Sequence, residues 1–501
     1  MGFGPSFWSH SLVAVVSVLL TSAIWLTAYF AGIQPNLNKG ITNNNITNNY
    51  CNSTSQTCQK AEMPKCADTC EFVICESIPA GMQFDPKYPI FNTTTDCWLR
   101  LMQEAKQEIL IASYYWSLLL KDADGFTDDR ANTSFNGQLI YDTLLKTAVE
   151  KNIPIRIAQT YDKDGYVETA DLVTNSKGKI EVRSLDFTQW YPGGILHTKS
   201  WSVDSNHFYI GSANFDWRSL TQVKELGIAV FNCPCMGEDL KKLLEIYWQM
   251  GAPGAKLPQQ WDSKLATPAN HENPMSVNQP TGNEAIYISA SPPGFQACGR
   301  EDDLAAMIKS IDDAKEYLNM AVMDYSPTTL YMKNANKWMP ALDNAIRRAA
   351  FERAVKVRFM LSLWPHTYND AYGLMYSLQD ISKNLPCYQY KNDICTKKGS
   401  IEVRFIEVPS MKDIYGDIPY ARVYHNKYFT TESTAYIGTS NWSADYWEYT
   451  AGIGFIIRAD DTSVKSRLVQ DLTSIFERDW NSIYTIPLNQ FDISGNRTTI
   501  V

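Results

Sequence analysis

Two short phrases in this chain of 501 residues place the same reactive side chains at the same spacing. Each opens with one of only 6 histidines, followed at fixed intervals by a lysine and a carboxylate and then by Gly-Ser or Gly-Thr with an asparagine. The members are His197, Lys199, Asp204 and Asn214 in the first copy, and His425, Lys427, Glu432 and Asn441 in the second. A base, a cation, a carboxylate and an amide donor are half of a phosphoryl-transfer site.

The spacing predicts how these groups act together. In an extended strand residues i and i+2 share a face, so each histidine and its lysine project together. We expect the carboxylates to return past a turn and orient an imidazole. A neutral imidazole can attack phosphorus and a protonated one can release the leaving oxygen, while lysines and amides stabilise the phosphoryl charge. The predicted reaction is phosphodiester cleavage through a phosphohistidine, with water or an alcohol as second acceptor, and it requires no metal or other cofactor.

The regions around the two phrases also repeat. Ile-Glu-Val-Arg occurs at 180–183 and again at 401–404, and Glu76–Gly81 corresponds to Ser289–Gly294. Helical and strand patterns alternate in the same order in both halves. The sequence therefore predicts an α/β protein of two duplicated lobes, each a mixed, mostly parallel β-sheet flanked by helices, with one active site shared between them.

Composition shifts suggest the boundaries of these parts. Residues 252–284 contain five prolines and little apolar periodicity, which is typical of a linker. We expect the first lobe at 64–251 and the second at 285–501. The Asn- and Thr-rich residues 34–63 are expected to form a stalk.

Residues 11–33 are apolar and carry no charge, and they are long enough to span a bilayer. We expect a transmembrane signal-anchor helix there, with residues 1–10 as a cytosolic tail. A cleaved signal peptide is the competing interpretation.

Sequons and cysteines indicate that the body is lumenal. Outside the repeated phrases the Asn-x-Ser/Thr sites are Asn45, Asn52, Asn92, Asn132 and Asn496. The 11 cysteines fit an oxidising compartment. Disulfides are expected between the cluster Cys66, Cys70 and Cys75 and the pair Cys233 and Cys235, and between Cys387 and Cys395. A zinc site is the weaker alternative, because the spacing lacks partner histidines.

The paired phrases resemble the signature of the phospholipase D superfamily, His-x-Lys-x4-Asp used twice. The chain is similar in particular to the membrane-anchored lysosomal phospholipase-D-like exonucleases. The segments that carry this resemblance are Glu76–Gly81, His197–Trp201, Gly211–Gly227, Tyr436–Ser443 and Thr450–Gly452. Glu432 departs from the superfamily's aspartate but matches that branch in its second copy.

The resemblance implies a metal-independent 5′ exonuclease that degrades single-stranded DNA and RNA in an acidic lumen. It implies that the eight residues form one site, and we assign the nucleophile to His197 and the acid to His425. It also implies a homodimer in the endoplasmic reticulum, Golgi and endolysosomal pathway, whose lumenal body is released by proteolysis. The sequon at Asn441 would remain unmodified because it lies in the catalytic phrase.

Two other functions stay open. The same chemistry would serve a phospholipase D or transphosphatidylase acting on lysosomal phospholipids. A non-catalytic ectodomain is disfavoured because no side chain of the set is lost. The net charge of −9 argues against a basic surface for duplex binding. Aromatic residues beside the phrases could stack on bases, although core packing fits each of them better. They are Trp190, Tyr191, Trp201, Phe215, Trp217 and Trp442.

Overall fold

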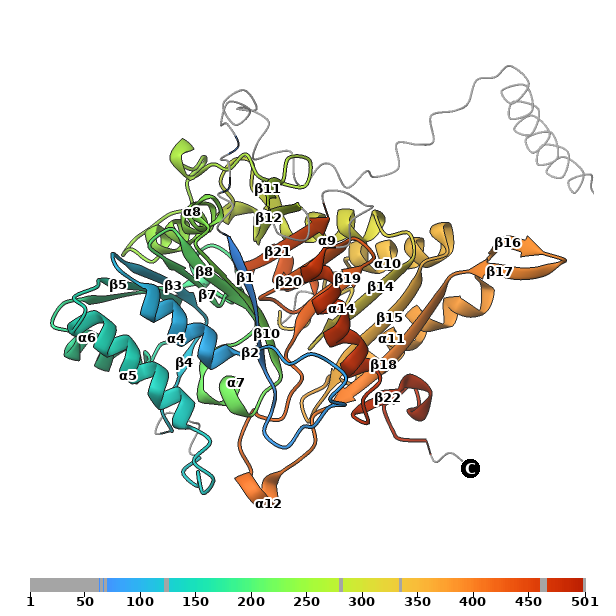
Figure 1. The fold of residues 1–501 in the computed structure, drawn as a ribbon, viewed down its shortest axis with the longest axis horizontal. Helices are drawn as coiled ribbons and strands as arrows, with labels where there is room; N and C mark the ends of the chain where they lie inside the picture. Colours follow the sequence, from blue (N-terminus) through green and yellow to red (C-terminus); the bar gives the residue numbers. More distant parts are fainter. Residues whose placement is uncertain are drawn as a thin grey trace, which may run out of the picture. The chain divides into compact units, whose positions relative to one another are not determined.

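Two mixed β-sheets, each covered by helices, form the part of the chain that the computed structural model describes (Figure 1). The described residues are 63, 66, 70–120, 126–278, 283–332, 336–459 and 466–498, and all belong to one compact unit. The expected tail at 1–10, the anchor at 11–33 and nearly all of the stalk at 34–63 lie outside them. Within the described ranges, no helix has both the length and the apolar character needed to cross a membrane.

The first sheet has eight strands in the order β2-β1-β10-β8-β7-β3-β5-β6. Their bounds are β1 Glu71–Ser77, β2 Asn92–Thr93, β3 Ile109–Ser113, β5 Ile155–Thr160, β6 Ile180–Leu185, β7 Ser200–Val203, β8 His207–Gly211 and β10 Glu225–Phe231. The short strands β4 Trp116–Ser117 and β9 Phe215–Asp216 pair with each other outside this sheet. The helices of this half are α4 Thr94–Glu104, α5 Phe135–Val149, α6 Val167–Asn175, α7 Trp217–Thr221 and α8 Pro234–Met250.

Both faces of the first sheet are buried because its strands are apolar on both sides. Ile109 and Ile111 of β3 point into a core beneath α4, whereas Leu110 and Ala112 point into a second core beneath α8. The second core continues without a break into the other sheet. The two sheets are therefore fixed to each other by a common apolar core rather than by a flexible joint.

The second sheet has ten strands in the order β11-β12-β21-β20-β19-β14-β15-β18-β22, with β13 beside β12. Their bounds are β11 Met275–Val277, β12 Glu284–Ser291, β13 Glu301–Asp302, β14 Tyr317–Val322, β15 Lys356–Leu363, β18 Ser400–Glu407, β19 Lys427–Thr431, β20 Thr434–Gly438, β21 Gly452–Ala459 and β22 Thr485–Pro487. β16 Cys387–Lys391 and β17 Ile394–Lys398 form a separate hairpin. The helices are α9 Asp303–Asp312, α10 Ala341–Arg353, α11 Asp370–Asp380, α12 Lys412–Tyr415, α13 Ala444–Glu448 and α14 Arg467–Trp480. β11 comes from the segment expected to be a linker.

Short 3₁₀ turns complete the described elements. They span Phe187–Gln189, Ser263–Leu265, Pro293–Phe295, Ile381–Asn384 and Leu488–Gln490.

The two sheets repeat one strand order, so that β1, β10, β8, β7, β3, β5 and β6 correspond to β12, β21, β20, β19, β14, β15 and β18. The expectation of mostly parallel sheets is wrong. Parallel pairing is confined to β3-β5-β6 and β14-β15-β18 and to the short pairs β1-β2 and β12-β13. The remaining neighbours are antiparallel, because tight hairpins such as β7-β8 and β19-β20 can join only antiparallel strands.

Disulfides fasten the start of the body to the first sheet. Cys66 pairs with Cys235 and Cys70 with Cys233, as expected, so the chain before β1 is joined to the beginning of α8. Cys387 pairs with Cys395 across the β16-β17 hairpin. These bonds use the sulfur atoms that the zinc alternative required. Several disulfides indicate a domain that folds in the lumen of the secretory pathway.

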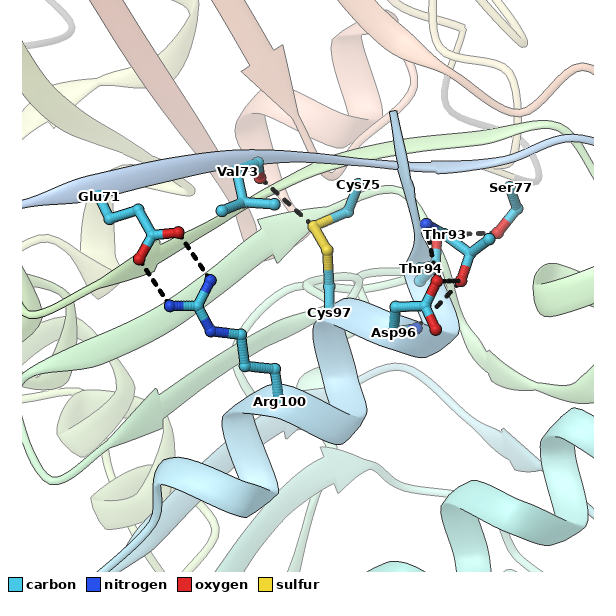
Figure 2. The surroundings of a disulfide bond; sticks show 9 residues. All are labelled: Glu71, Val73, Cys75, Ser77, Thr93, Thr94, Asp96, Cys97 and Arg100. Atoms are coloured by element: carbon cyan, nitrogen blue, oxygen red, sulfur yellow. Dashed lines mark hydrogen bonds and ion pairs between the residues drawn. A yellow bond between two sulfur atoms is a disulfide. The ribbon is translucent and has the colours of Figure 1, made fainter. Parts of the chain in front are cut away.

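A further disulfide, which the sequence analysis did not pair, joins Cys75 of β1 to Cys97 of α4 (Figure 2). Beside it Arg100 donates two hydrogen bonds to Glu71, at 2.7 and 2.6 Å. The bond closes a loop of 22 residues, which corresponds to roughly 3 kcal/mol of lost entropy in the unfolded chain.

The sequons that the structure describes agree with a glycosylated surface. Asn92, Asn132 and Asn496 are exposed, whereas Asn441 is 3% exposed. Asn45 and Asn52 lie outside the described residues.

Candidate active site

The two repeated phrases lie at equivalent positions in the two sheets. Lys199 directly precedes β7 and Lys427 is the first residue of β19, and each histidine stands two residues earlier. β7 and β19 run antiparallel to β3 and β14, so the start of each phrase lies at the edge where the parallel strands end. The carboxyl ends of such strands are the usual ligand-binding edge of α/β sheets.

Reciprocal backbone hydrogen bonds join each histidine segment to the opposite half of the chain. The His197 N–H donates to the Ala451 carbonyl (2.9 Å), and the Ala451 N–H donates to the Ile195 carbonyl (2.9 Å). In the same pattern the His425 N–H donates to Lys224 (2.8 Å), whose own N–H donates to Val423 (3.0 Å). Each histidine segment is thus held by the residue that precedes the central strand of the opposite sheet.

A buried ion network supports the second of these bridges. Lys224 donates to Glu76 of β1 at 2.6 Å, and Arg478 of α14 contacts Glu76 at 2.9 Å and also Asp479. Asp479 accepts a hydrogen bond from Tyr424, the neighbour of His425. Burial alone would raise the pKa of Glu76, but the two cations lower it to about 2. Glu76 therefore stays charged and connects the two halves next to the site.

The four basic side chains of the phrases are buried together. Each lysine Nζ donates to the backbone carbonyl of its own histidine, at 2.6 Å in both copies. Burial, and then the charge of Lys427, hold the pKa of Lys199 well below its usual range. Burial lowers the pKa of Lys427 to about 7, although nearby carboxylates oppose this shift. Basic groups this crowded and this deeply buried give up protons readily, and a bound anion would favour their charged forms.

His425 has a carboxylate partner that the sequence analysis did not assign. Its Nδ1 lies 3.0 and 2.8 Å from the two oxygens of Glu225, the first residue of β10 in the opposite sheet. Ser212 and Ser219 also donate to Glu225, at 2.5 and 2.9 Å. Burial alone would raise the pKa of Glu225, but His425 and Lys427 lower it. Burial has the largest effect on His425. The pKa of His425 is lowered to about 4, although the neighbouring Glu225 carboxylate opposes this shift.

One sequence feature could have revealed Glu225. Lys224 and Glu225 stand directly before the apolar run Leu226–Phe231. Charged residues at the start of such a buried strand need partners of opposite charge. The pattern predicts that partners exist, but not which ones.

His197 lacks the corresponding carboxylate. Gly227 faces Gly211 and Gly454 faces Gly438 in the two sheets, so the position equivalent to Glu225 is Gly452. A Cβ atom at Gly452 would lie only 2.2 Å from the Ser440 hydroxyl oxygen, which leaves no room for a side chain. The two halves of the site therefore differ in the contact between the histidine and a carboxylate from the opposite sheet.

Aromatic rings surround His197 instead. Its ring centre lies 5.1 Å from that of Tyr114 and 5.0 Å from that of Tyr446. Among the described residues, its Nδ1 has no hydrogen-bond partner. Burial, and then the charges of the two lysines and His425, hold the pKa of His197 well below its usual range. His197 is consequently neutral in the free protein.

The structure contradicts the orienting role expected of Asp204 and Glu432. The Asp204 oxygens accept from the backbone N–H groups of 106, 107 and 108 at 2.8 Å, and Glu432 accepts from 315 and 316. Both carboxylates follow a complete strand and stand seven residues after their histidines, a span of roughly 23 Å in extended chain. They instead fix the chain that leads into β3 and β14.

The two asparagines of the phrases have different surroundings. Both side-chain Oδ1 atoms are buried without a partner among the described residues. The Asn441 amide donates to Asp324 at 3.0 Å, and Tyr331 donates to the same carboxylate. Burial raises the pKa of Asp324. The burial of Asn441 also argues against its glycosylation.

The aromatic residues that flank the phrases mainly belong to the hydrophobic core, which is the role expected for them in preference to base stacking. Trp201, Trp217 and Phe215 are fully buried, Trp442 is 1% exposed, and Trp190 and Tyr191 pack around Phe295. The rings that line His197 were not singled out from the sequence.

Comparisons with known proteins agree with this architecture. A family described as "PLD3/4, PLD-like domain" matches residues 88–402. The "5'-3' exonuclease PLD3" of Xenopus tropicalis is 40% identical over 440 residues, which cover 87% of this chain and 85% of that protein. The human protein of the same name is 37% identical, with 86% and 84% covered. A "probable phospholipase D" of Caenorhabditis elegans is 37% identical, with 84% and 71% covered.

Proposed function

Since the chain belongs to the PLD3/4 family of phospholipase-D-like domains, we propose that it is a metal-independent 5′ exonuclease of single-stranded DNA and RNA. The buried cluster of two histidines and two lysines, in which Glu225 contacts His425, carries this proposal. The lobes are inferred to span 64–251 and 285–501, with 252–284 between them and one site shared by both.

In the first step the neutral His197 attacks the phosphorus, and His425 donates its proton to the leaving oxygen. The P–N bond forms as the P–O bond breaks, so the leaving strand departs as an alcohol. In the second step His425 takes a proton from water, whose oxygen displaces His197 from phosphorus. The two lysines and the amides of Asn214 and Asn441 stabilise the phosphoryl oxygens. Asp204 and Glu432 support the fold of the site rather than the chemistry.

The assignment of the acid rests on Glu225. A carboxylate beside an imidazole stabilises its protonated form, and of the two histidines His425 alone has a carboxylate as hydrogen-bond partner among the residues that the structure describes. The negative charge of a bound phosphodiester would raise the pKa of both histidines above their values in the free protein. The rate should therefore fall as the pH rises through the pKa of His425 in the complex, which suits an acidic lumen.

The placement in the cell follows from the same proposal. Residues 11–33 anchor a single-pass type II membrane protein of the endoplasmic reticulum, Golgi and endolysosomal pathway. The catalytic body is lumenal, in keeping with its disulfides and exposed sequons. We also infer a homodimer and a soluble form released by proteolysis.

A second candidate function is phospholipid cleavage or transphosphatidylation, which the name of the C. elegans relative favours. The chemistry at phosphorus is the same, and an alcohol replaces water in the second step.

One assay separates these functions. The purified protein is offered a 5′-hydroxyl single-stranded oligonucleotide and, separately, phosphatidylcholine or phosphatidylglycerol, at acidic and neutral pH. We expect nucleotides to be released one at a time, and both His197→Ala and His425→Ala to lose this activity. His271→Ala, a half-buried histidine outside the site, is the control. Choline release or glycerol exchange without nucleotide products would favour the phospholipid function, and turnover by either active-site variant would refute the shared mechanism.

A further inference from the structure

A group of three aromatic rings, two of them exposed, includes one ring from the chain segment that carries His425. Trp364 and His366 follow the end of β15, and Tyr420 stands five residues before His425. The His366 ring stacks on Tyr420 with centres 5.3 Å apart and planes at 18°. Trp364 tilts against His366 at 4.7 Å. Tyr420 is 58% exposed and His366 is also exposed, whereas Trp364 is half-buried; these three rings are here called the aromatic platform, and two of them are open to solvent.

Both chain segments that carry the aromatic platform, the end of β15 and the residues before His425, lead to the neighbourhood of the catalytic residues. The Tyr424 N–H donates to the Ser362 hydroxyl at 3.2 Å, which joins the end of β15 to the neighbour of His425. Trp364 follows Ser362 by two residues. Tyr420 can lie at most about 18 Å from His425, since an extended chain advances no more than about 3.6 Å per residue. Stacked bases repeat every ~3.4 Å, so a few nucleotides would cover this distance.

The backbone that presents Tyr420 is strained and firmly held. Tyr420 and Arg422 have φ angles of 54° and 58°, in the left-handed region that non-glycine residues rarely occupy. The Arg422 guanidinium donates to the carbonyls of Pro409 and Ala80 at 2.7 to 2.9 Å, and so ties the segment to the first half of the chain. Strain that the surroundings maintain in this way often marks a functional segment.

The chemistry of the site also determines which side of it the leaving strand uses. A general acid must lie within hydrogen-bond reach of the oxygen that it protonates. With His425 as the acid, the strand that carries the leaving oxygen passes on the His425 side. The His197 ring, in contrast, is flanked by Tyr114 and by Tyr446, which is 7% exposed. Tyr420 of the aromatic platform precedes that acid by five residues on the same chain segment.

We propose that Trp364, His366 and Tyr420 stack on a base of the departing single strand, a few nucleotides from the cleaved phosphodiester. The inference rests on the proposed nuclease function and adds a substrate subsite to it. Base stacking on exposed rings does not depend on sequence, because every base has a π-face. The aromatic platform would thus hold a strand of any sequence while successive phosphates enter the site.

The test compares a substrate that reaches the aromatic platform with one that does not. KM and kcat are measured for single-stranded oligonucleotides of increasing length and for bis(p-nitrophenyl) phosphate, which has no base. In Tyr420→Ala and His366→Ala we expect KM for long oligonucleotides to rise about 10-fold, with kcat and the small diester unaffected. Tyr420→Phe keeps the ring and should behave as the parent. Tyr390→Ala removes another exposed tyrosine, on the β16-β17 hairpin, and is the matched control.

The outcomes are distinct. If KM for oligonucleotides is unchanged in both alanine variants, the proposed base stacking on the aromatic platform is wrong, while the nuclease function stands. An equal loss on both substrates indicates a structural role and also overturns it. A parent protein that cleaves the small diester but no oligonucleotide refutes the nuclease function, and the aromatic platform with it.

Discussion

Replacing Glu225 with glutamine removes the charge beside His425 while keeping the size of the side chain. The bond from Nδ1 to Glu225, at 2.8 Å, is charge-assisted when His425 is protonated. Such bonds are worth about 1.5–3 kcal/mol, so the pKa of His425 should fall by about 1–2 units. Because the reaction requires protonated His425, kcat/KM should fall about 10- to 100-fold at pH values above that pKa.

The pH profile is the informative measurement. Glu225 raises the pKa of His425, so its loss should move the high-pH limb of kcat/KM to lower pH and leave little defect at the acidic end. If His425 were instead the nucleophile, it would have to be neutral, and the low-pH limb would move. A uniform loss at every pH, or an unmoved profile, would refute the acid assignment.

A matched control separates this effect from the loss of any buried carboxylate. Glu284 is also buried, begins a central strand of its sheet and accepts a serine hydroxyl, from Ser466 at 2.7 Å. It lies seven residues along β12 from Ser291, roughly 23 Å from the edge that carries the site. Glu284→Gln should leave the pH profile unchanged, and the unfolding temperature of both variants reports whether they fold.

Three other predictions concern the supporting structure and the absence of a cofactor. Asp204→Asn should lower the free energy of unfolding by about 1–3 kcal/mol, because an amide cannot accept all three backbone N–H groups, and an altered pH profile would contradict this purely structural role. Glu76→Gln should destabilise the protein by about 3 kcal/mol near neutral pH. Its native pKa, about 2, is depressed, so this difference is present above about pH 4.5 and should vanish as the pH falls towards 2; denaturant unfolding across this range measures it. EDTA should leave nuclease activity unchanged, and a loss restored by a divalent cation would contradict the phosphohistidine scheme.

Helices and strands can be predicted from the sequence because the apolar spacing that marks each of them lies within one short segment. Apolar residues at helical spacing, such as Leu472 and Phe476, form the buried face of α14. The apolar run at 317–322 forms β14. The direction of the strands was predicted less well. Hairpins at 203–207 and 431–434 reverse the chain inside each phrase, and turns this short join antiparallel strands.

The sequence by itself determined that the two histidine–lysine pairs occupy equivalent places, because a duplicated phrase in a duplicated fold must do so. Only the tertiary structure decided the partners of those residues. It brings Glu225 to His425 across 200 positions, leaves Gly452 opposite His197, and takes Asp204 and Glu432 away to distant backbone N–H groups. Hydrogen bonds form between atoms about 3 Å apart, and such proximity depends on how two sheets pack rather than on spacing along the chain.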